Sequence, residues 1–387
     1  MELQISDPGA GGREFTPVVD QHASWLAVNP VQGCPKRCRY CFLNQRQQTK
    51  VAPVRLATAA QTVAILLASP LYGPERAVAL FTWTDVMAVA SSRTYLAGLL
   101  EALVAASVPN TIVLITKCRI PDGTIEAIKA ARAAGLRVLV YLSYSGLDSA
   151  IEVGIRHEQL VANFPALTAA GIPVVHYWRP AFPASATNQT MTRVVDLAAR
   201  YAVCSMAAGL KVEADALPRL AELWPELATT PGVTDAECVY PAAFWEFIHH
   251  TGERHPGYPV FHSNSCALAY AVQESDRFGI YGTATCLHRN RCPAAQRSRC
   301  ARALAEATPV TEADVAAALA RRGLDGTAFT HRAGDRVVTV HGAVPSAIVS
   351  AITQDLGIRV VPAGQGSDPY WSSGTAGARP LVIGASS

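Results

Sequence analysis

The sequence predicts an α/β fold in which short strands and helices alternate along a chain of 387 residues. Between about Trp25 and Lys211, short apolar runs rich in β-branched residues alternate with alanine-rich stretches of helical character. The sequences Ala-Ala-Gly-Leu at 133–136 and Ala-Ala-Gly-Ile at 169–172 each come just before an expected strand, and their glycine suits the position after a helix. Repeated βα units predict a parallel sheet covered by helices, either an open doubly wound sheet or a complete or partial barrel.

Six strands are expected in this part of the chain, at residues 25–29, 77–82, 111–116, 137–143, 173–179 and 205–211. Both forms of the sheet place chemistry at the carboxyl ends of the strands. Polar residues lie at several of these ends. We therefore take four of them as candidate catalytic residues: Asp85, Lys117, Tyr144 and Arg179.

The chain is longer than the roughly 100–200 residues of a typical domain, and its pattern changes along the sequence. We expect four parts: an N-terminal extension at 1–20, the sheet and its helices at 21–258, a cysteine-rich segment at 259–307 and a small α/β domain at 308–387. In the last part, a helix begins near Thr311, and strands at 336–341 and 359–362 flank a helix at 345–356.

Composition excludes several classes of protein. Half of the residues are apolar and 16% are charged, which indicates a globular protein with a substantial core. The net charge of +3 is too small to indicate a nucleic acid or an anionic membrane as partner. No apolar run reaches the ~18 residues of a membrane span. The first residues lack the basic and apolar regions of a signal peptide, so we expect a cytoplasmic protein.

In a reducing cytosol, cysteines more often bind metal or act in redox chemistry than form disulfides. The chain has ten cysteines. Seven of them fall into two groups, the first being Cys34, Cys38 and Cys41, and the second being Cys266, Cys286, Cys292 and Cys300. This grouping indicates metal binding.

The first group is a CxxxCxxC run that follows the first expected strand. Three thiolates so close together can bind three irons of one [4Fe–4S] cluster and leave the fourth iron without a protein ligand. The alternative is a zinc site, which usually has four protein ligands and CxxC pairs.

With aromatic Tyr40 before the last cysteine, this motif resembles that of the radical S-adenosylmethionine (SAM) superfamily. The resemblance implies a partial (β/α)6 TIM-like barrel with this loop after its first strand. It also implies that SAM binds the open iron, and that an electron from a partner such as flavodoxin or ferredoxin leads to a 5′-deoxyadenosyl radical. That radical abstracts hydrogen from the substrate, while the protein supplies orientation and excludes water.

Further segments resemble the spore photoproduct lyase-like branch of that superfamily: Thr116-Lys117 at the third strand end, 141–144 on the fourth strand, and Ile151-Glu152 with Arg156. The resemblance implies that Tyr40, Ser143, Glu152 and Arg156 lie near SAM. An alternative for Glu152 and Arg156, which are four residues apart, is an ordinary ion pair on a helix surface.

One departure from that branch concerns its hydrogen-donating cysteine at the end of the second strand. Here the stretch reads Thr82-Trp83-Thr84-Asp85 and contains no cysteine. A hydroxyl O–H bond is too strong to replace a thiol readily as a radical hydrogen donor. The resemblance therefore supports the scaffold and not the photoproduct repair reaction.

The second cysteine group allows three interpretations: an auxiliary [4Fe–4S] cluster, a structural zinc, or thiols without a metal. His262 and His288 are close enough in sequence to act as substitute ligands. The same segment contains five arginines, Arg289, Arg291, Arg297, Arg299 and Arg302. They could bind phosphate or carboxylate groups, or balance the negative charge of a thiolate-bound metal.

The fifth expected strand ends in an aromatic run. Because strand residues alternate between faces, His176 and Trp178 share one face, and Tyr177 and Arg179 share the other. One of these pairs should line the inside of a barrel.

The sequence thus predicts an oxidoreductase or lyase of the radical SAM type. We expect it to abstract hydrogen from a small metabolite or a nucleotide-like substrate, leading to oxidation, elimination or rearrangement. The alternatives are radical modification of a peptide or nucleic acid, a non-catalytic iron–sulfur sensor or electron carrier, and a structural zinc protein.

Overall fold

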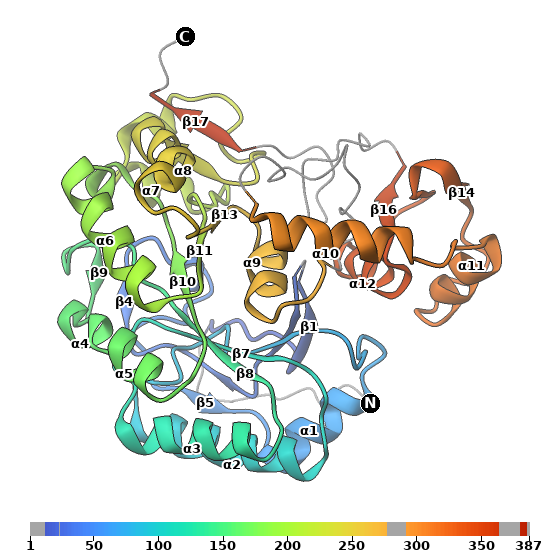
Figure 1. Ribbon diagram of the computed structural model, residues 1–387, viewed down its shortest axis with the longest axis horizontal. Coiled ribbons are helices and arrows are strands. Elements are labelled where there is room, and N and C mark those ends of the chain that lie inside the picture. Colours follow the sequence, from blue (N-terminus) through green and yellow to red (C-terminus); the bar gives the residue numbers. More distant parts are fainter. Residues whose placement is uncertain (1–11, 23, 277–291, 364–379, 385–387) are drawn as a thin grey trace.

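The computed structural model describes residues 12–22, 24–276, 292–363 and 380–384. Its centre is an eight-stranded sheet in the order β1-β2-β6-β7-β8-β10-β11-β13 (Figure 1). These strands are β1 Val19–Gln21, β2 Leu26–Val28, β6 Val78–Leu80, β7 Ile112–Thr116, β8 Val138–Leu142, β10 Val174–Trp178, β11 Cys204–Ala207 and β13 Val260–Phe261. Only β1 is antiparallel to its neighbour among the strands of this sheet.

The strand order decides between the two predicted forms of the sheet. From β2 to β13 the strands lie side by side in chain order, whereas a doubly wound sheet reverses direction at a switch point. In the described part of the chain, no pairing joins β13 to β1. The sheet is therefore open and singly wound, consistent with a partial barrel.

All six predicted strands are present within a few residues of their expected bounds, and two further strands of this sheet, β1 and β13, were not predicted. β1 has three residues and β13 has two, which is too short for an alternating pattern to show in the sequence. β13 lies in the segment expected to be cysteine-rich, yet it pairs with β11 and extends the sheet.

Helices cover the outer face of the sheet, because each parallel crossover needs a long connection. They are α1 Ala59–Ala68, α2 Ala90–Ala105, α3 Asp122–Ala133, α4 His157–Val161, α5 Asn163–Ala169, α6 Asn188–Tyr201 and α8 Ala242–Arg254. In Figure 1, α1 to α3 lie along the lower side of the sheet and α4 to α6 along its left side. None of the helices in the described ranges combines the length and apolar character that crossing a bilayer requires.

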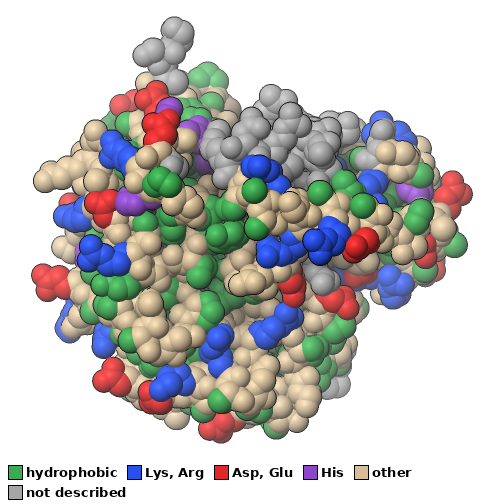
Figure 2. All heavy atoms as spheres, in the orientation of Figure 1, with side chains coloured by type: hydrophobic (Ala, Val, Ile, Leu, Met, Phe, Trp, Pro, Cys, Tyr) green, Lys and Arg blue, Asp and Glu red, His purple; other side chains and the backbone are tan. Residues whose placement is uncertain are grey.

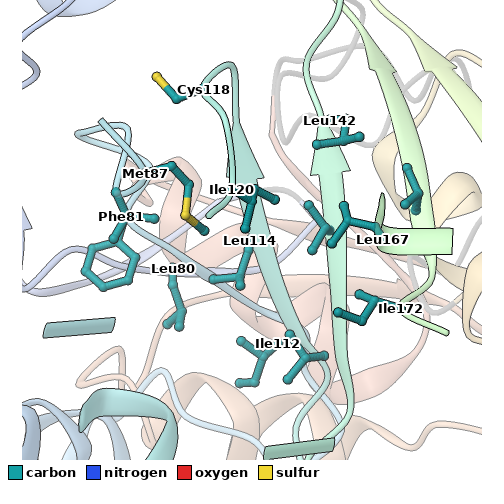
Figure 3. Close-up of a cluster of buried hydrophobic side chains, with 14 of the residues drawn as sticks. Leu80, Phe81, Met87, Ile112, Leu114, Cys118, Ile120, Leu142, Leu167 and Ile172 are labelled. Atoms are coloured by element: carbon teal, nitrogen blue, oxygen red, sulfur yellow. The ribbon is translucent and has the colours of Figure 1, made fainter. Parts of the chain in front are cut away.

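The outer face carries the larger hydrophobic core. Figure 3 shows Leu80, Ile112, Leu114 and Leu142 on neighbouring strands, with Leu167 of α5 beside them, and all five are fully buried. Such close packing of strand and helix side chains is the main apolar contribution to stability.

The pleat of β10 separates the aromatic residues of its carboxyl end. Trp178 packs on the outer side against Phe244 of α8, with ring centroids 4.8 Å apart. Tyr177 packs on the inner side against Tyr141 of β8, with centroids 5.2 Å apart. Of the two predicted pairs, Tyr177 and Arg179 therefore belong to the inner face.

The inner face is covered by α9 (Asn264–Ala271), which contacts β10, β11 and β13. Ala267 and Leu268 of α9 pack in the same buried cluster as Tyr141 and Tyr177. α10 (Ala294–Ala305) follows, and α7 (Leu217–Ala221) comes after β11 in the chain. Short 3-10 turns are η1 Phe42–Asn44, η2 Pro183–Ser185, η3 Pro225–Ala228 and η4 Ala333–Asp335.

The C-terminal elements form a separate three-stranded sheet, β14-β15-β16, with two helices. They are α11 Glu312–Ala320, β14 Phe329–Arg332, β15 Val337–Val340, α12 Ser346–Leu356 and β16 Arg359–Pro362. The predicted helices and strands of this part are present, and β14 was not predicted. The last described strand, β17 (Leu381–Ile383), instead pairs with β12 (Val239–Pro241) near α8 (Figure 1). The division of the chain into four parts stays a prediction.

A buried ion-pair cluster attaches α12 to the amino edge of the large sheet. Asp355 of α12 accepts a hydrogen bond from Arg76, which precedes β6, and pairs with Arg322 at 2.6 Å. Both arginine side chains are almost fully buried. Arg76 also donates to the Ala351 carbonyl oxygen at 2.9 Å.

We predict that Asp355→Asn destabilises the protein by about 3–5 kcal/mol, because it leaves two buried guanidinium groups without their carboxylate. Denaturant unfolding and hydrogen exchange of α12 measure the effect. The matched control is Asp325→Asn, an exposed aspartate in the same part of the chain, which should change stability by less than about 0.5 kcal/mol. Equal effects of the two variants would contradict the prediction.

His176 on β10 is fully buried, and burial favours the neutral form of its ring. Nε2 donates to the Tyr144 carbonyl oxygen at 2.8 Å, so in the neutral ring Nδ1 accepts from the Ser205 hydroxyl at 2.8 Å. Burial lowers the pKa of His176 to about 4.

We predict that this histidine makes the fold acid-sensitive. The depressed folded-state pKa contributes stability that is present above pH 6.5 and is lost as the pH falls toward 4, roughly 3 kcal/mol in all. His176→Gln should flatten the fall of the denaturation midpoint between pH 7 and 4.5, whereas His250→Gln on the surface of α8 should not. An unchanged pH dependence in His176→Gln would contradict this assignment.

Candidate functional site

The three cysteines of the CxxxCxxC run lie in a loop at residues 33–53, here called the cysteine loop, which follows β2 and the short strand β3. Its base is closed by the antiparallel pair β3 (Val31–Gln32) and β5 (Val54–Arg55). Gly33 begins the loop at φ +98°, where a Cβ atom would approach Arg13 Nη2 to 2.5 Å and the Ala52 carbonyl oxygen to 3.1 Å. Glycine is therefore required at this position.

The thiols of the cysteine loop are shielded from solvent. Cys34 and Cys38 are buried and Cys41 is half-buried. Asn44 fixes the backbone between them, because its Nδ2 donates to the carbonyl oxygens of Cys38 at 2.9 Å and Cys41 at 2.8 Å. The loop thus presents three thiols on a backbone held by side-chain hydrogen bonds.

Burial raises the pKa of Cys34 and Cys38 to about 12 and that of Cys41 to about 11. Nearby cations oppose this rise at two of the three. Lys117 lowers the pKa of Cys38, and Arg219 and Arg179 lower that of Cys41. These charges favour the thiolate form that iron requires.

This donor set fits a [4Fe–4S] cluster with one open iron, because it offers three thiols from one loop with cations beside two of them. In the described ranges, no three His, Cys, Asp or Glu side chains are grouped around a position for a single metal ion.

The buried carboxylate of Glu152 connects this loop to the carboxyl edge of the sheet. Glu152 lies on β9 (Glu152–Val153), which pairs with β4 (Arg37–Cys38) so that Glu152 is opposite Cys38. Its Oε1 accepts hydrogen bonds from the Tyr40 hydroxyl, from Ser145 Oγ at 2.9 Å and from Lys117 Nζ at 2.8 Å. Its Oε2 is 2.8 Å from His157 Nε2.

These contacts keep Glu152 ionised although it is completely buried. Burial opposes ionisation, but the charge of Lys117 and hydrogen bonds from His157, Lys117 and Tyr40 outweigh it and lower the pKa of Glu152 to about 2. The Lys117 ammonium also lies over the Tyr40 ring, 5.7 Å from its centroid, and donates to the Ser143 carbonyl oxygen at 3.1 Å. Glu152 and Lys117 therefore form a neutral pair between the cysteine loop and the strand ends.

The surface ion pair considered for Glu152 and Arg156 is wrong. Glu152 is on a strand and has no exposed surface, whereas Arg156 is exposed where α4 begins. The carboxylate is already paired with Lys117 and His157. The spacing of four residues suggested a helix that does not include Glu152.

Asp85 and Tyr144, two of the candidate catalytic residues, have structural contacts in this fold. Asp85 accepts from Thr116 Oγ1 at 2.7 Å and from the Lys117 backbone N–H at 2.8 Å, which fixes the end of β7. Tyr144 packs in the outer core with the helices. Ser143, which follows β8, is buried beside Lys117. The roles predicted for these residues stay predictions.

The second cysteine group is only partly described. Cys266 lies on α9 and donates to Asp276 at 3.7 Å; Cys292 is buried against the inner face; Cys300 lies on α10 and accepts from Gln296 at 3.5 Å. Cys286, His288, Arg289 and Arg291 lie outside the described residues. His262 follows β13, and its Nε2 is 3.0 Å from Nε2 of His249.

Sequence reasoning missed three residues of this site. Ser145 and His157 bind Glu152, and Arg219 of α7 donates to Gln45 of the cysteine loop at 3.0 Å. Ser145 lies in the segment between β8 and β9, His157 begins α4, and Arg219 comes from a short helix far along the chain. No local pattern marks any of them.

Several solved structures are similar to this chain. A spore photoproduct lyase complexed with dinucleoside spore photoproduct matches 61% of this chain and 75% of its own, at 15% identity and a TM-score of 0.46. SuiB from Streptococcus suis matches 66% of this chain and 54% of its own, at 12% identity and a TM-score of 0.41. A radical SAM methyltransferase from Sphaerobacter thermophilus matches 55% of this chain and 65% of its own, at 12% identity and a TM-score of 0.36.

No protein-family model matches the sequence, and no curated protein matches it. The likeness to solved structures is distant, and function is inferred below from the residues of this chain.

We predict that Glu152→Gln loosens the cysteine loop. The amide leaves the Lys117 ammonium buried without its carboxylate, so stability should fall by about 3–5 kcal/mol, and a chelator should remove reconstituted iron about tenfold faster. Denaturant unfolding and iron release kinetics measure the two effects.

The matched control is Glu222→Gln, which removes an exposed ion pair with Arg39 of the same loop. It should lower the free energy of unfolding by less than about 1 kcal/mol and leave the rate of iron release unchanged. If Glu152→Gln behaves like this control, Glu152 does not anchor the loop.

Proposed function

We propose that this chain is a radical SAM enzyme that holds a [4Fe–4S] cluster on Cys34, Cys38 and Cys41. The observation that carries the proposal is the position of these thiols. They lie in a fixed loop after the first parallel strand, beside cations from the carboxyl ends of β7 and β10.

The cluster with bound SAM supplies a 5′-deoxyadenosyl radical that abstracts hydrogen from a substrate. The protein's own contribution is to hold and shield the reacting groups. Cys34, Cys38 and Cys41 bind the iron, while Glu152 and Lys117 tie their loop to the strand ends without leaving a net charge. We propose Tyr40, Ser143 and Arg156 as further residues near SAM, with Tyr40 acting through its hydrogen bond to Glu152.

The buried inner face favours a small substrate. Tyr177 of β10 lies on this face next to Tyr141, Arg179 follows the strand, and α9 covers this face. We propose a small metabolite or nucleotide-like substrate undergoing oxidation, elimination or rearrangement.

On the face drawn in Figure 2, basic and acidic side chains of the described residues are interspersed. Flavodoxin or ferredoxin is the proposed reductant and the cytoplasm the proposed location.

We also propose an auxiliary [4Fe–4S] cluster on the second cysteine group. Cys266, Cys292 and Cys300 come from α9, from the approach to α10 and from α10 itself, and Cys292 packs on the inner face. Such a cluster would accept or deliver an electron during turnover.

The test of the proposed function is anaerobic reconstitution of the wild type and of the Cys34/Cys38/Cys41→Ala variant, with iron counts and dithionite-driven SAM cleavage on both. Wild type should form 5′-deoxyadenosine, and the variant should form none and bind about four fewer irons per chain. Cys204→Ala, which removes a buried thiol of β11 outside this loop, should keep both properties.

Wild-type protein that binds iron but neither binds nor cleaves SAM would overturn the proposal in favour of an electron carrier. Zinc without iron would overturn it in favour of a structural metal site. If the triple variant keeps about four irons, the auxiliary cluster is supported; if it keeps none, that second proposal is wrong.

A further inference from the structure

A cavity of about 460 Å³ is lined by the end of α10 and by the C-terminal elements, beside the ion pairs of Asp355. Ala303 and Ala307 belong to its apolar wall, and Arg321 and Arg336 bring two cations to its lining. The neighbouring α12 is attached to the amino edge of the large sheet, whereas the cysteine loop follows the carboxyl end of β2. The cavity is therefore separate from the candidate functional site.

Positive charge exceeds negative charge around Asp355. Its carboxylate pairs with three guanidinium groups, those of Arg76, of Arg322 at 2.6 Å and of Arg321 at 3.5 Å. The side chains of Arg76 and Arg322 are only 4% and 3% exposed. Burial and the charges of the other two arginines lower the pKa of Arg322, and the carboxylate does not fully offset them. Because a buried charge is costly unless it is paired, three cations on one carboxylate favour a further anion here.

Two further carboxylates lie near this cluster, and both side chains are exposed. Asp314 lines the cavity, but it caps α11 by accepting hydrogen bonds from the Thr311 backbone N–H at 2.8 Å and hydroxyl at 2.7 Å. Glu75 raises the pKa of Arg76 less than Asp355 does. Charges in contact with water are screened, so these two carboxylates compensate the buried guanidinium groups less well than Asp355.

Arg336 brings a buried donor to the cavity. Its Nη2 donates to the Gly357 carbonyl oxygen at 2.9 Å, whereas its Nε is buried without a hydrogen-bond partner among the described residues. Buried N–H groups are nearly always paired in folded proteins, so a donor of this kind in a cavity lining indicates a ligand.

We propose that this cavity binds a phosphate group, held by Arg321 and Arg336. The planar fork of an arginine matches two oxygens of a phosphate. A phosphate carries close to two negative charges at neutral pH, which balances the two positive charges that three arginines and one carboxylate leave at Asp355. Inorganic phosphate and the phosphate of a small organic molecule share this chemistry, and the apolar wall favours the organic molecule.

Inorganic phosphate and phenyl phosphate are the probes for this site. Isothermal titration calorimetry of the reconstituted protein, at constant ionic strength, gives the dissociation constant of each. Arg321→Gln and Arg336→Gln should each raise the constant for phosphate at least about fivefold, because each removes charged hydrogen-bond donors. Arg200→Gln, which removes an exposed cation of α6, should leave it unchanged.

The two probes identify the source of the phosphate group. Phenyl phosphate that binds at least about threefold more tightly than inorganic phosphate supports an organic ligand, and equal or weaker binding supports inorganic phosphate. Phosphate that does not bind the wild type, or binds both variants unaltered, would overturn the site. Arg321 is 57% exposed, so Arg321→Gln decides the question if Arg336→Gln does not fold.

Hydrogen exchange locates the bound phosphate. Because a ligand stabilises the elements that hold it, phosphate should slow exchange in α11 and α12 and leave the cysteine loop unchanged. Slower exchange in the cysteine loop alone would place the phosphate at the candidate functional site and overturn the proposal. Neither measurement requires SAM cleavage, so this inference and the proposed function fail separately.

Discussion

The buried carboxylate of Glu152 is the contact on which the site depends. It joins three parts of the chain that are far apart in sequence: the cysteine loop through Tyr40, the end of β7 through Lys117, and the segment after β8 through Ser145. A carboxylate without exposed surface is stable only when its charge is matched and its oxygens are hydrogen-bonded. The pair with Lys117 and the bond with His157 meet both conditions.

This arrangement explains how a loop of 21 residues, 33–53, could hold thiols in a fixed place. The pairing of β4 with β9 puts Cys38 opposite Glu152, and the pairing of β3 with β5 closes the base of the loop. Lys117 is neutralised by Glu152, while Arg179, which follows β10, donates to the Tyr177 hydroxyl oxygen.

The sequence predicted the elements that local patterns determine. Six strands with β-branched runs and the polar ends at Lys117 and Arg179 were found where expected. The faces of β10 followed from the alternation of side chains, although the side that turns inward could be decided only once α9 was seen to cover Tyr177. β13 was missed because two residues give no period.

The contacts of Glu152 could not be predicted in the same way. Its spacing from Arg156 indicated a helix, but the residue lies on β9, and this strand exists because it pairs with the cysteine loop more than 100 residues earlier. Pairing between distant segments leaves no local signal, and neither does the ion pair with Lys117.

The most direct test of the central claim is electron paramagnetic resonance of the reconstituted, dithionite-reduced wild type before and after addition of SAM. If three cysteines hold a [4Fe–4S] cluster with an open iron, the reduced protein should give the signal of such a cluster, and SAM should change its g values. A reduced-cluster signal that SAM leaves unchanged would mean that no iron is available to it, and the chain would then not be a radical SAM enzyme.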